Sequence, residues 1–346
     1  MSEPSVAVQP FYQRDRCTLY QGDCLEILPL FPANSVDLIF ADPPYNLSNN
    51  GFTCHGGRAV SVNKGDWDRS NGIEQDFEFH RAWIQECRRI LKPNGTIWIS
   101  GTYHNIYACG FALQCLDFHV LNEICWYKPN ASPNLSCRFF TASHETLIWA
   151  RKSKKGKHVF NYEAMKLGDF PRDPLKLSGR QMRSVWSIPT PPASEKLQGK
   201  HPTQKPLDLL DRIISASTNP GDLVLDPFSG SGTTGLSALR VDRVFIGIEK
   251  EAAYLQLAVD RFTTAPLPGS ETSEDNHVLA NGKSSSQPGQ QPSHQPDNQT
   301  NSKASSKANN SASSQTKTGS QPAGASVMEP SNSPSSYPSP PNHPNH

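Results

Sequence analysis

The chain has 346 residues with a net charge of +1, and 35% of them are hydrophobic. This length is enough for one large or two modest domains, and so balanced a charge indicates no class of partner. No stretch reaches the roughly 18 apolar residues of a membrane span, and the first residues do not resemble a signal peptide. We therefore expect a cytoplasmic protein with no membrane association.

The first 265 residues alternate between strand and helix patterns, read from apolar spacing. Strands are predicted over 18–20, 36–40, 96–99, 119–127, 145–150, 223–225 and 244–248. Helices are predicted over 25–28, 77–91, 106–116, 207–217, 235–239 and 252–262. This alternation predicts an α/β fold with a mostly parallel sheet and helices on both faces.

Composition divides the chain into five parts. An N-terminal extension, 1–14, precedes a first α/β portion, 15–150. Residues 151–200 lack clean periodicity, and 201–265 form a second α/β portion. Residues 266–346 are rich in Ser, Pro, Asn and Gln. They have too few apolar residues to offset the entropy of ordering, so we expect a disordered, dispensable tail.

The segment 151–200 concentrates positive charge. It contains 12 Lys or Arg and 4 Asp or Glu, a net charge of +8. Such clustering is typical of a surface that faces phosphates, although a solvated lysine loop explains it equally well.

The 8 cysteines are scattered, with no C-x-x-C pair. Several lie inside apolar patterns, so we expect reduced packing cysteines and no metal site. His55, Phe139 and Trp186 are likewise expected to be structural, and Trp67 either packs its loop or supports a base pocket.

Two motifs follow predicted strands. Asp42-Pro43-Pro44-Tyr45 follows the strand 36–40, and the glycine-rich run 226–235, DPFSGSGTTG, follows the strand 223–225. Ligands of open α/β sheets bind outside the carboxyl ends of strands, so both motifs can line one site.

The glycine-rich run predicts a cofactor loop, because glycines let a backbone approach a ligand closely. It does not match a P-loop, since no Lys follows the glycines, and Asp226 before them does not suit a dinucleotide. A carboxylate there suits an ammonium group, and Glu249 ends the next strand where a ribose would lie. Together they predict S-adenosylmethionine, held by Asp226, Phe228, Gly230, Gly232, Thr233 and Glu249.

Asp42-Pro43-Pro44-Tyr45 resembles the catalytic motif of DNA amino-methyltransferases, and 226–235 resembles their cofactor motif. The motif order is similar to that of the permuted β-class, and the resemblance covers about residues 15–262. It implies a Rossmann-like S-adenosylmethionine-dependent fold. It also implies that Asp23 faces the cofactor's adenine and that Thr203 and Lys205, in His201–Pro206, lie near its methionine carboxylate.

The resemblance also implies a chemistry for the first motif. An exocyclic amine is a poor nucleophile, because its lone pair is delocalised into the ring. Asp42 and the Pro43 carbonyl would each accept an N–H bond and direct the lone pair at the methyl group. Pro43 and Pro44 stiffen the backbone, and Tyr45 would stack on the flipped base.

Adenine N6 in DNA is the preferred target, because Asp at the first motif position is more typical of adenine enzymes. Cytosine N4 remains the alternative, followed by an RNA amino-methyltransferase or a catalytically silent binding protein. Cytosine-C5 chemistry is disfavoured, because the chain has no Pro-Cys dipeptide. The expected partner is double-stranded DNA, with single-stranded DNA and a homodimer left open and any companion endonuclease unidentified. DNA contacts are predicted for Lys64, Arg172, Arg180, Gln181 and Arg183.

Overall fold

The computed structural model describes residues 8–46, 52–55, 58–61 and 68–265, with side chains outside 52–61. The predicted tail, 266–346, and the predictions for Lys64, Trp67 and the His55 side chain lie outside this description.

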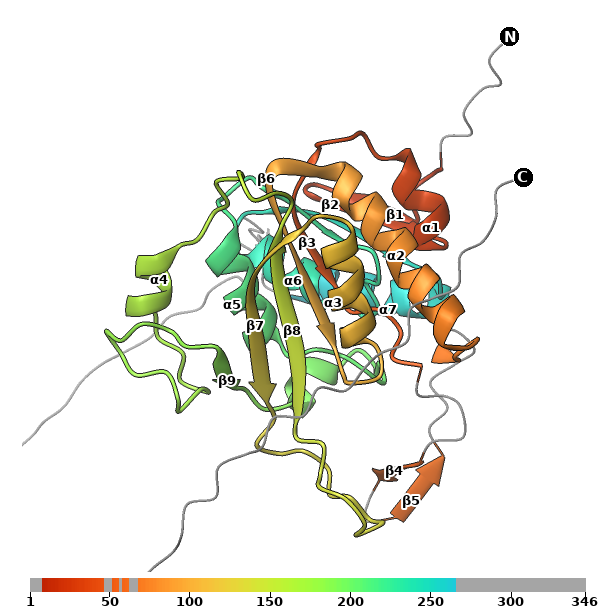
Figure 1. Ribbon diagram of the computed structural model, residues 1–346, viewed down its shortest axis with the longest axis vertical. Helices are drawn as coiled ribbons and strands as arrows, with labels where there is room; N and C mark the ends of the chain where they lie inside the picture. The colour runs from red at the N-terminus through yellow and green to blue at the C-terminus, as the bar shows by residue number, and fades with distance from the viewer. Residues whose placement is uncertain (1–7, 47–51, 56–57, 62–67, 266–346) are drawn as a thin grey trace, which may run out of the picture. The chain divides into compact units, whose positions relative to one another are not determined.

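A nine-stranded sheet has the order β1-β2-β11-β10-β3-β6-β8-β7-β9 (Figure 1). Neighbours from β2 to β6 run parallel; β1 is antiparallel to β2, β8 is antiparallel to β6 and β7, and β9 is parallel to β7. This confirms the predicted, mostly parallel sheet. The strands are β1 (Tyr12–Arg14), β2 (Cys17–Gln21), β3 (Val36–Ala41), β6 (Leu91–Gly101), β7 (His119–Tyr127), β8 (His144–Arg151), β9 (Val185–Ser187), β10 (Leu223–Asp226) and β11 (Val244–Glu249). A separate hairpin pairs β4 (Phe52–His55) with β5 (Arg58–Ser61).

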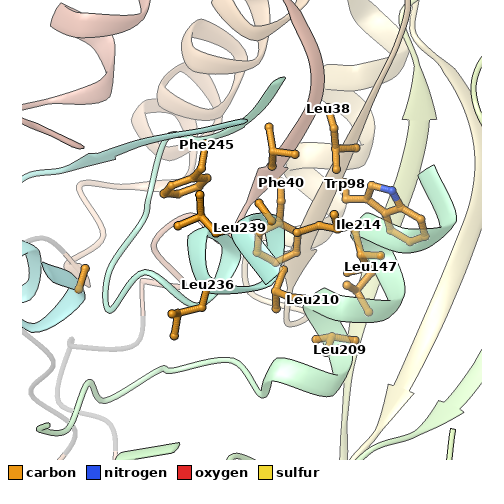
Figure 2. Packing of buried hydrophobic residues seen from close by; sticks show 14 of the residues in the cluster. Leu38, Phe40, Trp98, Leu147, Leu209, Leu210, Ile214, Leu236, Leu239 and Phe245 are labelled. Carbon is orange, nitrogen blue, oxygen red and sulfur yellow. The ribbon is translucent and has the colours of Figure 1, made fainter. Parts of the chain in front are cut away.

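Helices cover both faces of the sheet because side chains alternate along each strand. In β3, Leu38 and Phe40 pack into one apolar cluster and Ile39 and Ala41 into the other. The helices are α1 (Cys24–Ile27), α2 (Ile73–Ile90), α3 (Ile106–Cys115), α4 (Tyr162–Leu167), α5 (Leu207–Ser217), α6 (Thr233–Arg240) and α7 (Ala252–Thr264). Apolar residues of α1, α2 and α3 join the cluster of Ile39, and those of α5, α6 and α7 join the cluster of Phe40. Figure 2 shows α5 and α6 presenting leucines to Phe40 and Phe245.

Three differences from the predicted elements arise from pairing that local sequence does not encode. β1 and β9 are three-residue strands at the two sheet edges, so they are too short to show a period. β6 begins at Leu91 instead of residue 96, and a register irregularity against β3 accommodates Pro93, Asn94 and Gly95. A bulge of this kind is one of the few places where a strand tolerates proline.

The sheet order brings four strand ends together. β2, β11, β10 and β3 are parallel neighbours, so their carboxyl ends lie at one edge, which we call the catalytic edge. β8 runs the opposite way and therefore begins there, at His144 and Glu145. Within the described part of the chain, no helix is long and apolar enough to cross a membrane.

Candidate active site

A pocket opens at the catalytic edge, where both motifs meet. Its walls come from the ends of β2, β3 and β11, from the glycine loop after β10, and from the segment before α5. The lining residues are Gly22, Asp23, Cys24, Asp42, Pro43, Pro44, Tyr45, Asp68, Phe79, His201, Thr203, Pro227, Phe228, Gly230, Glu249, Lys250 and Tyr254. Two motifs that are 180 residues apart in sequence therefore form one site.

The glycine loop uses its two positive-φ glycines differently. Gly230 has φ +51° and lines the pocket, and a Cβ there would lie 3.2 Å from the His201 ring. Gly232 has φ +73° and caps α6, and a Cβ there would lie 2.8 Å from Ala258 and Phe262. Gly230 therefore serves the ligand side, whereas Gly232, predicted as a cofactor contact, serves packing against α7.

Asp226 holds the loop in shape. Its Oδ1 accepts from the Phe228 N–H at 2.9 Å and its Oδ2 from the Thr234 hydroxyl at 2.6 Å. Burial raises the pKa of Asp226 to about 7, although both hydrogen bonds oppose the rise. The carboxyl is thus only partly ionised near neutral pH, and an ammonium group beside it would favour the charged form.

Glu249 and Asp23 also combine loop bonds with access to the pocket. Glu249 accepts from the Gly230 N–H at 2.8 Å and the Glu251 N–H at 2.9 Å, and burial raises its pKa. Asp23 caps α1 through the Leu25 N–H at 2.9 Å. Each carboxylate keeps further lone pairs for ribose or amine donors.

The remaining predicted cofactor residues complete the walls. The Phe228 ring lies 5.3 Å from Trp83 and 6.3 Å from Phe79, which gives the pocket an apolar aromatic side. The Thr203 N–H lies 3.3 Å from His201 Nδ1, and Thr233 accepts at 3.0 Å from Arg261 beside a small adjoining cavity. An apolar wall with carboxylates around it fits S-adenosylmethionine, which has an adenine ring, ribose hydroxyls and an ammonium group.

Asp42, the predicted acceptor of the amine, lines the pocket. Its Oδ1 accepts from the Tyr45 hydroxyl at 2.6 Å, and its Oδ2 is bonded by the Lys205 ammonium. Lys205, with 6% of its side chain exposed, also lies 3.6 Å from Glu145 Oε2. Asp42 therefore stands in a buried ion network at the end of β3.

Glu145 and Lys128 are members of this network that sequence reasoning missed. Glu145 Oε2 lies 3.0 Å from the Tyr45 hydroxyl, and Glu145 Oε1 accepts from Lys128 Nζ at 2.9 Å. The negative charges of two carboxylates are thus balanced by the positive charges of two ammonium groups. The only signal in the sequence is a carboxylate opening the apolar strand β8, and its partner in the motif, Tyr45, is 100 residues away.

The network shifts the pKa values of its acids in opposite directions. Burial raises the pKa of Asp42, and Lys205 offsets only part of that rise. Burial also acts on Glu145, but the two nearby lysines outweigh it and bring the pKa of Glu145 down to about 2. Glu145 therefore keeps its charge, whereas the charge of Asp42 depends on Lys205.

Two buried polar side chains fix the backbone of the motif. Asp68, which is fully buried, accepts from the N–H groups of Tyr45 at 2.8 Å and Asn46 at 2.9 Å. Asn105 donates to the Pro44 carbonyl at 3.2 Å. The motif is thus held from both sides before any substrate arrives.

Lys205 and Tyr45 make contacts that their predicted roles did not include. Lys205 was predicted near the methionine carboxylate, and its ammonium contacts Asp42 and Glu145. Tyr45 was predicted to stack on the base; it lines the pocket with 5% of its surface exposed, and the Lys205 ammonium lies 5.2 Å from its ring centroid. The contact of Lys205 pairs the buried carboxylate of Asp42.

The predicted DNA contacts are dispersed. Arg172 lies 3.0 Å from Asp208 and 3.7 Å from Glu195, so ion pairs engage its guanidinium. Gln181, Arg180 and Arg183 are exposed before the edge strand β9. The lysine-rich stretch after Arg151 follows the end of β8 and therefore lies at the sheet edge opposite Asp42. That position supports the solvated-loop interpretation for this stretch. In the described ranges, no group of three or more His, Cys, Asp or Glu is placed to hold a metal ion.

Comparison with known proteins agrees with this geometry. The chain matches the N6/N4 methyltransferase family model, described as DNA methylase, over residues 36–260. It is 49% identical over 258 residues to the Type II methyltransferase M2.MboI of Moraxella bovis, covering 74% of this chain and 91% of the relative. It is 51% identical over 255 residues to the Type II methyltransferase M2.DpnII of Streptococcus pneumoniae, covering 73% and 92%.

A solved structure supports the cofactor. The crystal structure of the M1.HpyAVI–SAM complex is similar with a TM-score of 0.51 and 31% identity, over 71% of this chain and 98% of that one. Its bound ligand is the molecule that the pocket fits. The chain belongs to the N6/N4 DNA methylase family and is an S-adenosylmethionine-dependent DNA amino-methyltransferase.

Proposed function

We propose that this enzyme methylates the N6 amine of adenine in double-stranded DNA, with Asp42 as the group that receives the amine. The observation that carries the proposal is the Asp42 carboxylate, which lines the pocket on a motif whose backbone is fixed by Asp68 and Asn105. An acid at this motif position is typical of adenine enzymes in the family. Cytosine N4 is the competing target, because it offers the same kind of amine.

Asp42 can accept the amine without losing its present partners. A carboxylate offers about four lone-pair sites, and Tyr45 and Lys205 use one on each oxygen. An N–H group of the base can therefore bind beside them, while the Pro43 carbonyl accepts the second N–H. Two acceptors of this kind concentrate the lone pair on nitrogen and stabilise the positive charge that develops there.

The other residues of the site hold the cofactor and orient Asp42. Asp226, Glu249, Asp23 and Phe228 would bind S-adenosylmethionine, which supplies an electrophilic methyl group when bound. Lys205 favours the ionised form of Asp42 against the effect of burial, and Tyr45 fixes the orientation of the carboxylate. Because these groups are preorganised, little rearrangement is needed when the base enters.

Mass analysis of nucleosides released from methylated DNA tests the target. Unmethylated plasmid and S-adenosylmethionine are incubated with wild-type protein, Asp42→Asn and Asp42→Ala. We expect N6-methyladenine from wild type only, with the cofactor bound equally by all three. N4-methylcytosine would overturn the choice of base and leave the role of Asp42 intact. Full activity of Asp42→Ala would overturn the role of Asp42.

The Type II naming of the relatives supports a biological setting. We propose that the enzyme acts in the cytoplasm at a specific duplex site, alongside an endonuclease of a restriction–modification pair, and we keep a homodimer as its proposed assembly. Sedimentation with and without duplex DNA tests the assembly: a mass of one chain under both conditions would exclude the dimer.

A further inference from the structure

The loop joining β7 and β8, residues 128–143, extends beyond the catalytic edge (Figure 1). Tyr127, the last residue of β7, pairs with His144, the first residue of β8. The next residue, Glu145, contacts Tyr45 and Lys205. The base of this loop is therefore one residue away from the network that holds Asp42.

The loop tip exposes large apolar side chains to solvent. Phe139 is 72% exposed, Phe140 is 97% exposed and Leu135 is 41% exposed. This corrects the expectation that Phe139 is a packing residue. Two adjacent phenylalanine side chains that are largely exposed to solvent are unfavourable in water. Such a tip therefore indicates a surface that a binding partner covers when the protein acts.

Internal hydrogen bonds give the tip a defined shape. Asn134 Nδ2 donates to the Phe139 carbonyl at 2.6 Å, and Asn134 Oδ1 accepts from the Ser136 N–H at 3.0 Å. Cys137 has φ +54°, a conformation that non-glycine residues seldom adopt. The Asn130 side chain binds Thr190 through two bonds of 3.0 Å and fixes the stem. The phenylalanines are thus held outward on a structured loop.

The charge of the loop suits DNA. Residues 128–143 contain Lys128 and Arg138 and no Asp or Glu. Lys128 is paired with Glu145, and Arg138 is next to the two phenylalanines at the tip. A cation beside exposed aromatic rings is the combination that binds a phosphate backbone and stacks on bases.

We propose that Phe139 and Phe140 form an aromatic wedge that enters the base stack of the substrate DNA, with Arg138 on the adjoining phosphates. An enzyme that extracts a base must unstack the duplex, and inserted apolar side chains stabilise a duplex distorted in this way. The wedge rests on the DNA methyltransferase activity and not on which base is methylated. A second copy of the chain is the competing occupant of the tip.

The test uses full-length protein with Phe139→Ser/Phe140→Ser, and Tyr107→Ser as the matched control. Tyr107 is an aromatic residue on α3 with 74% exposure. Unmethylated plasmid and S-adenosylmethionine are the substrates. We expect the double variant to lose at least about tenfold in kcat/KM for DNA, the scale of one lost base–aromatic stack. Its cofactor Kd and Tm should stay within error of wild type, and Tyr107→Ser should match wild type throughout.

A second variant reports stacking directly. Phe140→Trp should retain activity, and its added fluorescence should be quenched by duplex DNA in a salt-dependent manner. Unchanged kinetics of the double variant, with wild type active, would overturn the wedge. A double variant that changes sedimentation mass at unchanged DNA affinity would also overturn it and assign the tip to a second copy. Failure of wild type to methylate any DNA would instead count against the activity itself.

Discussion

Asp42 shows how a buried acid can be kept reactive. Burial raises the pKa of Asp42, and the nearby charge of Glu145 raises it further, whereas Lys205 lowers it. Asp226 and Tyr45 also face this carboxyl, and Asp226 couples to it electrostatically. Because Lys205 is the cation bonded to Asp42, the ionisation of this proposed reacting group depends on one side chain.

Substitution of Lys205 should therefore move the pH profile of methyl transfer. In Lys205→Met the pKa of Asp42 should rise further. The proton that Asp42 then binds occupies one carboxyl oxygen, and that oxygen can no longer accept an N–H group of the base. The acid limb of the single-turnover rate should shift upward by about one pH unit or more, so the variant loses more activity at pH 6 than at pH 8.5. Rates measured between pH 5.5 and 9 check this.

Lys92→Met is the matched control for that profile. Lys92 pairs with Asp37 at 2.7 Å, on β6 and β3, away from the pocket. Its removal should leave the profile in place. If Lys205→Met lowers the rate equally at every pH, the lysine only supports the fold of the site and its electrostatic role is wrong.

At the scale of elements, Asp68 fixes the backbone where the Asp42–Tyr45 motif ends. The Asp68 carboxylate accepts from two consecutive N–H groups, those of Tyr45 and Asn46. Asp68→Ala removes both bonds, and hydrogen bonds to a charged group contribute about 1.5–3 kcal/mol each. We expect a loss of about 3–6 kcal/mol in the free energy of unfolding and a fall in kcat.

Asp68→Asn separates the two effects, since its amide oxygen can still accept both N–H groups. It should recover most of the stability and the kcat lost in Asp68→Ala. Urea denaturation and single-turnover rates measure both. Equal damage from both substitutions would mean that the charge of Asp68, and not its geometry, matters.

Helix α2 contains a buried histidine that should make stability depend on pH. His80 is 1% exposed, and its Nδ1 accepts from Trp83 Nε1 at 3.2 Å. Burial lowers the pKa of His80 from 6.5 to about 4. The unfolded chain therefore binds a proton below pH 6.5 that the folded protein accepts only near pH 4, so His80 makes folding less favourable as the pH falls through this window.

The size of this effect follows from linkage. Each unit of pKa difference corresponds to about 1.4 kcal/mol, so the full penalty at pH 4 is about 3 kcal/mol. His80→Phe should remove it, and the free energy of unfolding of the variant should then fall less steeply between pH 6.5 and pH 4. If the free energy of unfolding falls equally with pH in wild type and variant, His80 is solvated in the folded protein.

The elements also show what local sequence can specify. The helix predicted at 207–217 is α5, with the same bounds, because its apolar spacing matches one buried face. The strand predicted at 223–225 is β10, which is one residue longer and ends at Asp226. Glu145, Lys128 and Asp68 could not be found this way, since each reaches the motif through tertiary contacts rather than through spacing. The position of the glycine loop between β10 and α6 was predictable because its residues are contiguous.

At the scale of the whole molecule, the pocket and the family match fall in the same part of the chain. Among the residues that the structure describes, the pocket lining runs from Gly22 to Tyr254, and the family match ends at residue 260. The relatives are covered over 91% and 92% of their lengths by about 255 residues of this chain. The matched part of this chain therefore nearly spans each relative, while about a quarter of this chain lies outside the match.

Removal of residues 266–346 should leave methyl transfer intact. The truncated chain retains Asp42, its network and the cofactor pocket, so kcat and the KM for plasmid DNA should stay within about twofold of wild type, a difference below 0.5 kcal/mol. S-adenosylmethionine should raise Tm equally in both forms, because a ligand stabilises only the state that binds it. Thermal melts with and without cofactor serve as the folding control. A higher KM for DNA, with an unchanged rise in Tm on adding S-adenosylmethionine, would assign the tail to DNA binding. The folded part of the protein would then be intact, and only its binding of DNA would be weaker.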